Sequence, residues 1–194
     1  MNTITTTLAT VAMFSDDGKK RYLLRKLWDE KMPSLAIIML APSEASGIEL
    51  DTTTQLVLNN ASRLGYGSVA IVNLFATLND FKLQQAEDED AENLKEILLA
   101  AKSADQVVYA PGVGKAKNKA FVQRQEQVLN ALRPYEVKLC CLCNESGDAR
   151  LQHPLSPAVR VWHLSALKIS ELLPNPAKEE QPTKKKSKKI PKEA

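Results

Sequence analysis

Long apolar runs, cysteines and histidines are all scarce in this chain of 194 residues. No stretch approaches the roughly 18 consecutive apolar residues that a membrane-spanning helix needs. The start, Met1–Thr7, lacks the basic and apolar regions of a signal peptide. We therefore expect a cytoplasmic protein that has no membrane partner. Hydrophobic residues make up 44% and charged residues 25%, which is typical of a globular domain.

The three cysteines lie within four positions, as Cys140, Cys141 and Cys143. An odd, clustered set argues against a disulfide scaffold, and a metal site would need wider spacing and further ligands nearby. The surrounding run 137–143 is apolar and predicts a buried strand, in which cysteine packs as a small hydrophobe. We expect no metal and no other cofactor.

The basic excess of the chain comes from its last residues. Residues 174–194 hold seven lysines and three glutamates, which leaves 19 basic and 20 acidic residues in the rest. The lysine run 184–189 has nothing apolar to bury, so we expect a disordered tail after a single domain over 1–173. Such a tail could contact the phosphates of nucleic acid. A solvated tail that aids solubility is the alternative.

Apolar and amphipathic stretches alternate along the first 173 residues. An Asp-Gly turn at 17–18 between the apolar stretches 7–14 and 21–25 predicts a hairpin. Buried strands are predicted at 35–40, 68–74, 105–110 and 137–143, and helices at 51–65, 83–101 and 117–132. This alternation predicts an α/β fold: three layers, α/β/α, with a central, mainly parallel sheet that the hairpin precedes.

Ligands of open α/β sheets bind outside the carboxyl ends of the strands, which directs attention to four loops. These loops are 41–44, 73–75, 111–114 and 144–157. In the last loop, His153 lies between prolines and could donate to a developing anion, although a histidine bonded only to loop backbone is the alternative. Asn73 ends an apolar strand and could match a nucleobase edge, or it could simply terminate the strand. His163 lies in an apolar run and is expected to be structural.

The turn Gly112–Lys115 lacks the full spacing of a phosphate-binding loop, so we interpret its glycines as a tight strand-to-helix turn. Lys115, Lys117 and Lys119 are candidates to attract phosphate. The chain has no Gly-x-Ser-x-Gly motif, and two histidines without a carboxylate-rich cluster argue against a metal hydrolase.

Three short motifs follow one another along the chain in the same order as in a known family. Residues 39–43 read Met-Leu-Ala-Pro-Ser, residues 72–75 read Val-Asn-Leu-Phe, and residues 153–155 read His-Pro-Leu. From about Ala12 to Leu155 the chain resembles an uncharacterised bacterial and phage family, a domain of unknown function. Members of that family typically read Met-Leu-Asn-Pro-Ser, then Val-Asn-Leu-Phe, then Arg-His-Pro-Leu.

That family is similar, more remotely, to the uracil-DNA glycosylase superfamily. In that superfamily a first strand ends in a motif containing proline, a later strand ends in asparagine, and a final loop reads His-Pro-Ser-Pro. Pro42, Asn73 and His153 follow the same order here. The resemblance implies a glycosylase-like fold, and a protein that recognises a flipped or modified base in DNA. It further implies a metal-independent cleavage of the N-glycosidic bond of that base.

The resemblance also implies roles for single residues. His153 would stabilise the departing anionic base, and Asn73 would read the edge of the base. Pro42 would approach the flipped nucleotide and Phe75 would stack on it, with a core phenylalanine as the alternative for Phe75. Ser43 and Ser156 would contact phosphate, together with Lys115.

One departure from the glycosylase pattern concerns the residue that positions water. Many glycosylases place Asp, Glu or Asn in the first motif, whereas Leu40 and Ala41 stand there in this chain. Glu44 and Asp51 are the candidates to replace it, and Asp51 is equally explained as a helix N-cap. Two alternatives to a glycosylase therefore stay open. One is a non-catalytic module that binds nucleic acid or a nucleotide through the same pocket, and the other is a nucleoside-processing enzyme.

Overall fold

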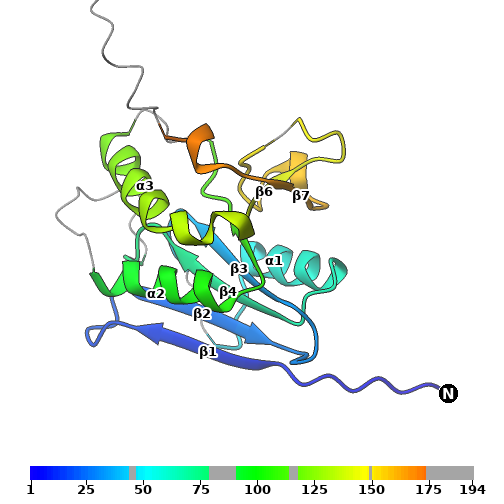
Figure 1. Ribbon diagram of the computed structural model, residues 1–194. Helices are drawn as coiled ribbons and strands as arrows, with labels where there is room; N and C mark the ends of the chain where they lie inside the picture. The colour runs from blue at the N-terminus through cyan, green and yellow to red at the C-terminus, as the bar shows by residue number, and fades with distance from the viewer. Residues whose placement is uncertain (44–46, 79–90, 114–117, 149, 174–194) are drawn as a thin grey trace, which may run out of the picture.

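The computed structural model describes residues 1–43, 47–78, 91–113, 118–148 and 150–173 of the chain. One seven-stranded sheet runs through it in the order β1-β2-β4-β3-β5-β6-β7, with helices packed against it (Figure 1). The fold is therefore α/β, as the alternation of strands and helices in the sequence predicts.

The strands are β1 (Ala9–Phe14), β2 (Arg21–Leu27), β3 (Ser34–Met39), β4 (Ser68–Asn73), β5 (Gln106–Tyr109), β6 (Leu139–Cys143) and β7 (His163–Ala166). The predicted hairpin is confirmed, because β1 and β2 pair antiparallel across the Asp-Gly turn. The four predicted buried strands are confirmed as β3, β4, β5 and β6. The short strand β7 was not predicted.

The prediction of a mainly parallel sheet is wrong, because the sheet is mixed. The pairs β4–β3, β3–β5 and β5–β6 are parallel, whereas the pairs β1–β2, β2–β4 and β6–β7 are antiparallel. The hairpin does not precede the sheet as a separate unit, since β2 pairs with β4 and sets Leu24 opposite Ile71. Both side chains are fully buried in one core. A two-stranded hairpin is marginally stable alone, and joining the sheet buries its apolar face.

Helices cover both faces of the sheet. Helix α1 (Thr52–Arg63) packs on one face, and α2 (Ala91–Ser103) and α3 (Lys119–Ala131) pack on the other (Figure 1). Within β3, Leu35 and Ile37 join the core under α1, whereas Ala36 and Ile38 join the core under α2 and α3. Burial on both faces explains the unbroken apolar sequence of this strand. Within the described residues, no helix is long and apolar enough to cross a membrane.

The beginnings of two helices depend on side-chain caps. The Asp51 carboxylate accepts a hydrogen bond from the Thr54 backbone N–H at 2.6 Å and begins α1. The Asn118 side chain accepts from Phe121 N–H at 2.9 Å and begins α3. Such caps satisfy N–H groups that the first helical turn leaves unpaired. The predicted beginning of the middle helix, 83–90, lies outside the described residues, as does the predicted tail 174–194.

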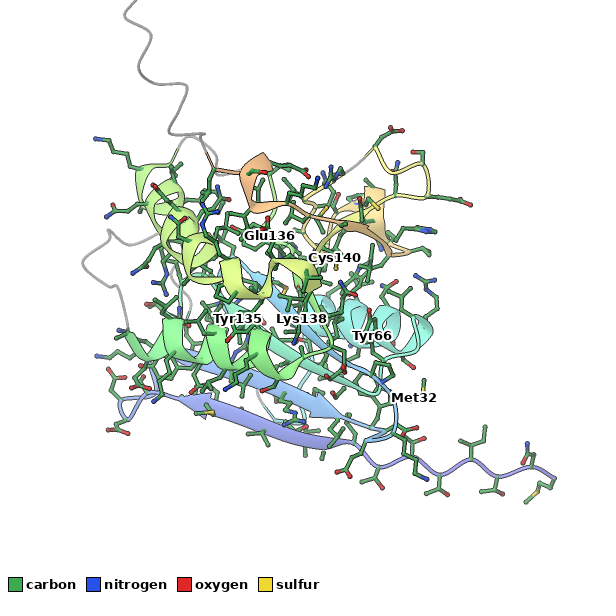
Figure 2. All side chains as sticks on the ribbon, in the orientation of Figure 1. Met32, Tyr66, Tyr135, Glu136, Lys138 and Cys140 are labelled. Atoms are coloured by element: carbon green, nitrogen blue, oxygen red, sulfur yellow. The ribbon has the colours of Figure 1, made fainter. Side chains whose placement is uncertain are left out.

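Among the described residues, short 3-10 helices join the larger elements: η2 (Arg133–Lys138), η3 (Pro157–Val159) and η4 (Ile169–Glu171). Two side chains of η2, labelled in Figure 2, connect it to its neighbours. Lys138 Nζ donates to the carbonyls of Lys102 and Ala104 at the end of α2, at 3.0 and 2.7 Å. Glu136 accepts from Ile169 N–H at 2.7 Å. These bonds fix the end of α2 against the turn that enters β6.

The cysteines lie on β6, where all five residues are buried and the three thiols are free. Cys140, labelled in Figure 2, donates a hydrogen bond from its thiol to the Val107 carbonyl at 3.4 Å. Burial raises the pKa of Cys140 to about 12, so the thiol stays protonated at neutral pH. The predicted core strand is therefore confirmed.

Candidate functional site

The parallel strands end at one edge of the sheet, and the chain order places a switch point there. β3 comes first in the chain, β4 lies on one side of it and β5 on the other. Ligand crevices of open α/β sheets lie where the strand order reverses in this way. Backbone bonds continue past the strand ends, from Leu74 N–H to the Met39 carbonyl and from Ala110 N–H to the Ile38 carbonyl, both at 2.8 Å. The loops that follow β3, β4 and β5 therefore start side by side.

Asp51 closes the loop after β3 and is half-buried beside two other polar groups. Burial alone would raise the pKa of its carboxyl. Hydrogen bonding with Ser43 and Thr54 and the positive charge of Arg21 outweigh that effect, so the pKa is lowered. One carboxylate oxygen, Oδ1, caps α1, while the buried Oδ2 has no hydrogen-bond partner in the structure as described. Asp51 is thus an ionised carboxylate at the beginning of α1, close to Ser43 and Arg21.

Two buried cations from β2 hold the same loop. Arg21, 1% exposed, donates from its guanidinium to the Ser43 carbonyl at 3.0 Å. Lys26, also 1% exposed, donates to the Gly47 carbonyl and to the Thr10 hydroxyl, the latter at 3.0 Å. Burial lowers the pKa of both groups, and for Arg21 the Asp51 charge opposes that shift. Both ends of the segment after β3 are therefore tied to the hairpin.

His153 lies against the loop that follows β5. A Cβ placed on Gly112, whose φ is +85°, would lie 3.3 Å from the Cβ of His153. Only glycine combines that left-handed backbone with so close an approach. The Leu155 N–H donates to His153 Nδ1 at 3.2 Å, so the neutral ring carries its proton on Nε2. Burial lowers the pKa of His153 and the nearby Asp51 charge opposes this, so at neutral pH the ring is a neutral Nε2–H donor.

The loop that carries His153 is constrained on both sides. Leu151 has a φ of 57°, a left-handed conformation that costs a residue with a side chain about 1–2 kcal/mol. Ser156 N–H donates to the His153 carbonyl at 2.8 Å, and the Ser156 hydroxyl donates to the Gln152 side chain at 2.9 Å. Strained backbone of this kind gathers at functional sites. Ser156, the predicted phosphate ligand, is engaged within its own loop.

Asn73 ends β4 and is 1% exposed. Strand alternation places its side chain on the face of Ile71, under α1, which is also the face on which Asp51 begins α1. Its Nδ2 is buried without a hydrogen-bond partner in the part of the chain that the structure describes. Its backbone carbonyl accepts from Asn93 Nδ2 at 3.1 Å. The alternative of a side chain bonded to its own strand end receives no support from these contacts.

The predicted site residues thus divide into three groups. Asn73 and Asp51 lie at the carboxyl edge on the α1 face, and His153 lies close enough to Asp51 for that charge to oppose the effect of burial on the pKa of the imidazole. Pro42 is buried in the loop after β3 beside Ser43. Phe75 is partly buried and packs against the core under α2 and α3, on the other face. Glu44 and Lys115 lie outside the described residues.

Sequence reasoning missed the groups that hold this edge and the loop after β3 in place. Lys26 lies two residues after Leu24, so strand alternation would have predicted it on the buried face. Arg124 from α3 donates to the Leu74 carbonyl at 2.8 Å and Asn93 from α2 donates to the same carbonyl at 3.1 Å. Helical position predicts that these two side chains face inward, but not that they meet a strand end.

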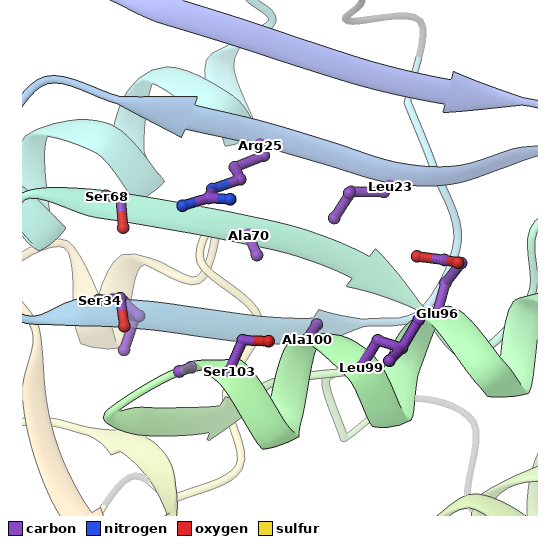
Figure 3. Close-up of a pocket in the computed structure, with 11 residues that line it drawn as sticks. Leu23, Arg25, Ser34, Ser68, Ala70, Glu96, Leu99, Ala100 and Ser103 are labelled. Carbon is purple, nitrogen blue, oxygen red and sulfur yellow. The ribbon is translucent and has the colours of Figure 1, made fainter. Parts of the chain in front are cut away.

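A cavity of about 390 Å³ borders the edge on the side of α3. Pro111, Gly112 and Leu151 line it together with Phe121. Another cavity, of about 160 Å³, lies between the sheet and α2, from Ser34 and Ser68 at the amino ends of β3 and β4 to Leu23 and Glu96 (Figure 3). The described lining of neither cavity includes Asp51, Asn73 or His153. Within the described residues, no cluster of histidine, cysteine and acidic side chains could hold a metal.

Comparison with protein families agrees with the motifs. The model of a family described as a protein of unknown function (DUF1643) matches residues 21–155. Because this match covers more than half of the chain, the protein belongs to that family. The search of curated proteins found no match, and neither did the search of solved structures.

Proposed function

We propose that this member of the DUF1643 family recognises a flipped or modified nucleobase at the carboxyl edge of its sheet and hydrolyses the N-glycosidic bond without a metal. The observation that carries the proposal is the state of His153. A neutral imidazole whose proton is held on Nε2 suits donation to a base that leaves as an anion. The glycosylase-like reading of the α/β fold belongs to the same proposal.

Asp51 supports the proposal as the group that positions water. Its lowered pKa keeps it ionised, and its Oδ2 has no partner among the described residues. Asp51 can therefore cap α1 with Oδ1 and accept from a water with Oδ2. In the reaction the glycosidic C–N bond breaks and its electron pair leaves with the base. The water oxygen bonds to the sugar carbon, and the proton of that water passes to the carboxylate or to solvent.

Asn73 supports the recognition half of the proposal. A buried amide nitrogen without a partner costs about 1–3 kcal/mol, a cost that a pairing ligand would remove. An amide can offer a donor and an acceptor together to the edge of a base. Ser43 is proposed to contact the adjoining phosphate, while Phe75, which packs in the opposite core, is not assigned to stacking.

Screening the full chain against single- and double-stranded DNA with a panel of modified bases, and against free nucleosides, tests this function. We expect free base and an abasic site from one class of DNA substrate, and no release by Asp51→Ala. Cleavage of free nucleosides alone would assign the site to nucleoside processing instead. Release of no base by the wild type, with any affinity retained, would reject hydrolysis.

A non-catalytic base-binding module is the second candidate, and one observation favours it. Leu40 and Ala41 stand where many glycosylases carry an acidic or amide residue. If this reading holds, Asn73→Ala will weaken binding to DNA while no variant and no substrate yields free base.

A further inference from the structure

Strand β1 forms one end of the sheet and leaves its outer side open. Within the described residues it pairs with β2 alone, so no strand accepts or donates at its outward backbone N–H and carbonyl groups (Figure 1). Five of its six residues are exposed, and only Ala12 is half-buried. Such an edge is a template on which another strand can pair. No residue of the candidate site lies on β1, so pairing here does not depend on base cleavage.

Large apolar side chains are exposed along this strand. Val11 and Met13 lie on the face of the sheet that α2 covers, and they are 52% and 40% exposed. Phe14, at the end of the strand, is 40% exposed, and Leu8, just before its beginning, is 48% exposed. Apolar side chains that gather on an exposed surface indicate an interaction site, whereas single ones are ordinary.

Charged side chains and proline are missing from this edge. No Asp, Glu, Lys or Arg occurs in residues 1–14, and Asp16, in the turn after β1, is the first charged residue of the sequence. Natural proteins usually protect an open edge with charged residues or proline, and β1 has neither. The strand at the other end of the sheet, β7, has four residues, of which only the last is exposed. The unprotected edge at β1 therefore favours a partner strand.

The order of side chains along β1 fits an antiparallel copy of the same strand. If Val11 opposes the partner's Val11 on a two-fold axis, then Ala9 opposes the partner's Met13, and Thr10 opposes the partner's Ala12. In both of these pairs a small side chain lies opposite a larger one. A charged residue near such an axis would oppose its own copy, which is destabilising. The absence of charge on β1 therefore favours a second copy of this chain as the partner.

The cations of the neighbouring strand do not oppose this pairing. Within one chain, Arg25 and Lys26 of β2 lie opposite Val11 and Thr10. In the paired arrangement two copies of β1 separate the two copies of β2, so equivalent cations are three strand spacings apart, about 14 Å. This distance exceeds the Debye length of about 8–10 Å at physiological salt, so their repulsion is largely screened.

We propose that this protein forms a two-fold dimer in which β1 pairs antiparallel with the partner's β1 about Val11, so that one sheet continues through both subunits. The pairing gives the outward backbone groups of β1 their hydrogen bonds and covers part of the apolar surface of Val11 and Met13. A single pair of short strands is a small interface beside the roughly 800 Å² per partner of a standard one, so we expect a Kd in the micromolar range.

Analytical ultracentrifugation of the full chain tests the dimer. We expect the mass to rise from one chain toward two as the concentration increases from about 1 µM to about 200 µM. Val11→Lys places two like charges opposite each other and should weaken association by at least about tenfold. Val161→Lys, at a position that is 56% exposed and lies outside the strands, is the matched control and should associate as the wild type does.

Mixing two variants tests the register. Val11→Lys and Val11→Glu proteins should associate with each other more tightly than either does with itself, because unlike charges then oppose each other on the axis. Val11 is exposed, so both variants are expected to fold, which circular dichroism checks. A wild type that remains a single chain at about 200 µM would overturn the dimer, as would a Val11→Lys variant that associates as tightly as the wild type. A mixture that associates no more tightly than either variant would overturn the axis at Val11, and a mass above two chains would indicate open head-to-tail pairing instead.

Discussion

The charged side chains at the two ends of the parallel strands differ in burial and in what they bond to. At the carboxyl edge, Arg21 is buried and donates to the Ser43 carbonyl, and the half-buried Asp51 caps the beginning of α1. At the amino edge, Asp105 accepts two hydrogen bonds from Ser34, and these groups are exposed to water. The first arrangement fixes the geometry of a loop in advance, which suits chemistry. The second joins the beginning of one strand to the beginning of the next, which is a structural role.

Among variants that keep the Asp51 carboxylate, removing the imidazole should give the largest effect on base release. If the carboxyl edge excises bases, His153→Ala should reduce the rate of base release by about 10²-fold or more, as expected for loss of one preorganised donor to an anion. His163→Ala, which alters the other histidine of the chain, on β7, is the matched control and should retain base release. If a single-turnover assay shows that the two variants lose base release equally, the specific role of His153 is contradicted.

Crowding His153 should give the next largest effect. Gly112→Ala adds a Cβ 3.3 Å from His153 at a φ of +85°, whereas Gly147→Ala adds one into open space at a φ of +83°. Both variants should lose about 1–2 kcal/mol of stability from the backbone alone. Only Gly112→Ala should displace the imidazole and slow base release by about tenfold or more. Thermal unfolding and turnover, measured on both proteins, separate the two contributions.

A smaller effect is expected at the amino edge. Asp105 accepts hydrogen bonds from the backbone N–H and the hydroxyl of Ser34, both at 2.8 Å, and these bonds lower the pKa of its carboxyl. Asp105→Ala should cost about 1 kcal/mol or less in urea unfolding, because the groups are exposed to water. It should leave base release unchanged. A change in base release would contradict the independence of the two ends.

The smallest expected change is a shift in the pKa of His153, which follows from removing the charge of Asp51. Asp51→Asn keeps an N-cap residue but removes the charge that raises the pKa of His153, so the His153 pKa should fall further. The neutral ring stabilises the folded state at pH values above the pKa of about 6.5 that His153 has in the unfolded chain. That stability is lost as the pH falls toward the lower pKa of His153 in the folded state. The variant should extend that loss to lower pH. Titration by NMR checks the direction, with Asp148→Asn, at an exposed loop position, as the control.

The sequence alone determined the elements of the fold because each carries a local pattern. The apolar run of β3 predicts burial on both faces, the Asp-Gly turn predicts the hairpin, and Asp51 predicts the beginning of α1. Chain order and the carboxyl-edge rule then predicted the neighbourhood of Asn73 and His153. These inferences depend only on periodicity and turn chemistry.

Only the tertiary structure decided the rest, because pairing and partners are non-local. The sequence of the hairpin does not predict that β2 pairs antiparallel with β4. This pairing makes the sheet mixed, whereas a mainly parallel sheet was expected. The Nε2 proton of His153 depends on the Leu155 N–H, and its position depends on contact with Gly112, far away in the chain. Likewise, Glu96 and Arg25 are ordinary charges in the sequence, and they line one cavity only because α2 packs on the sheet.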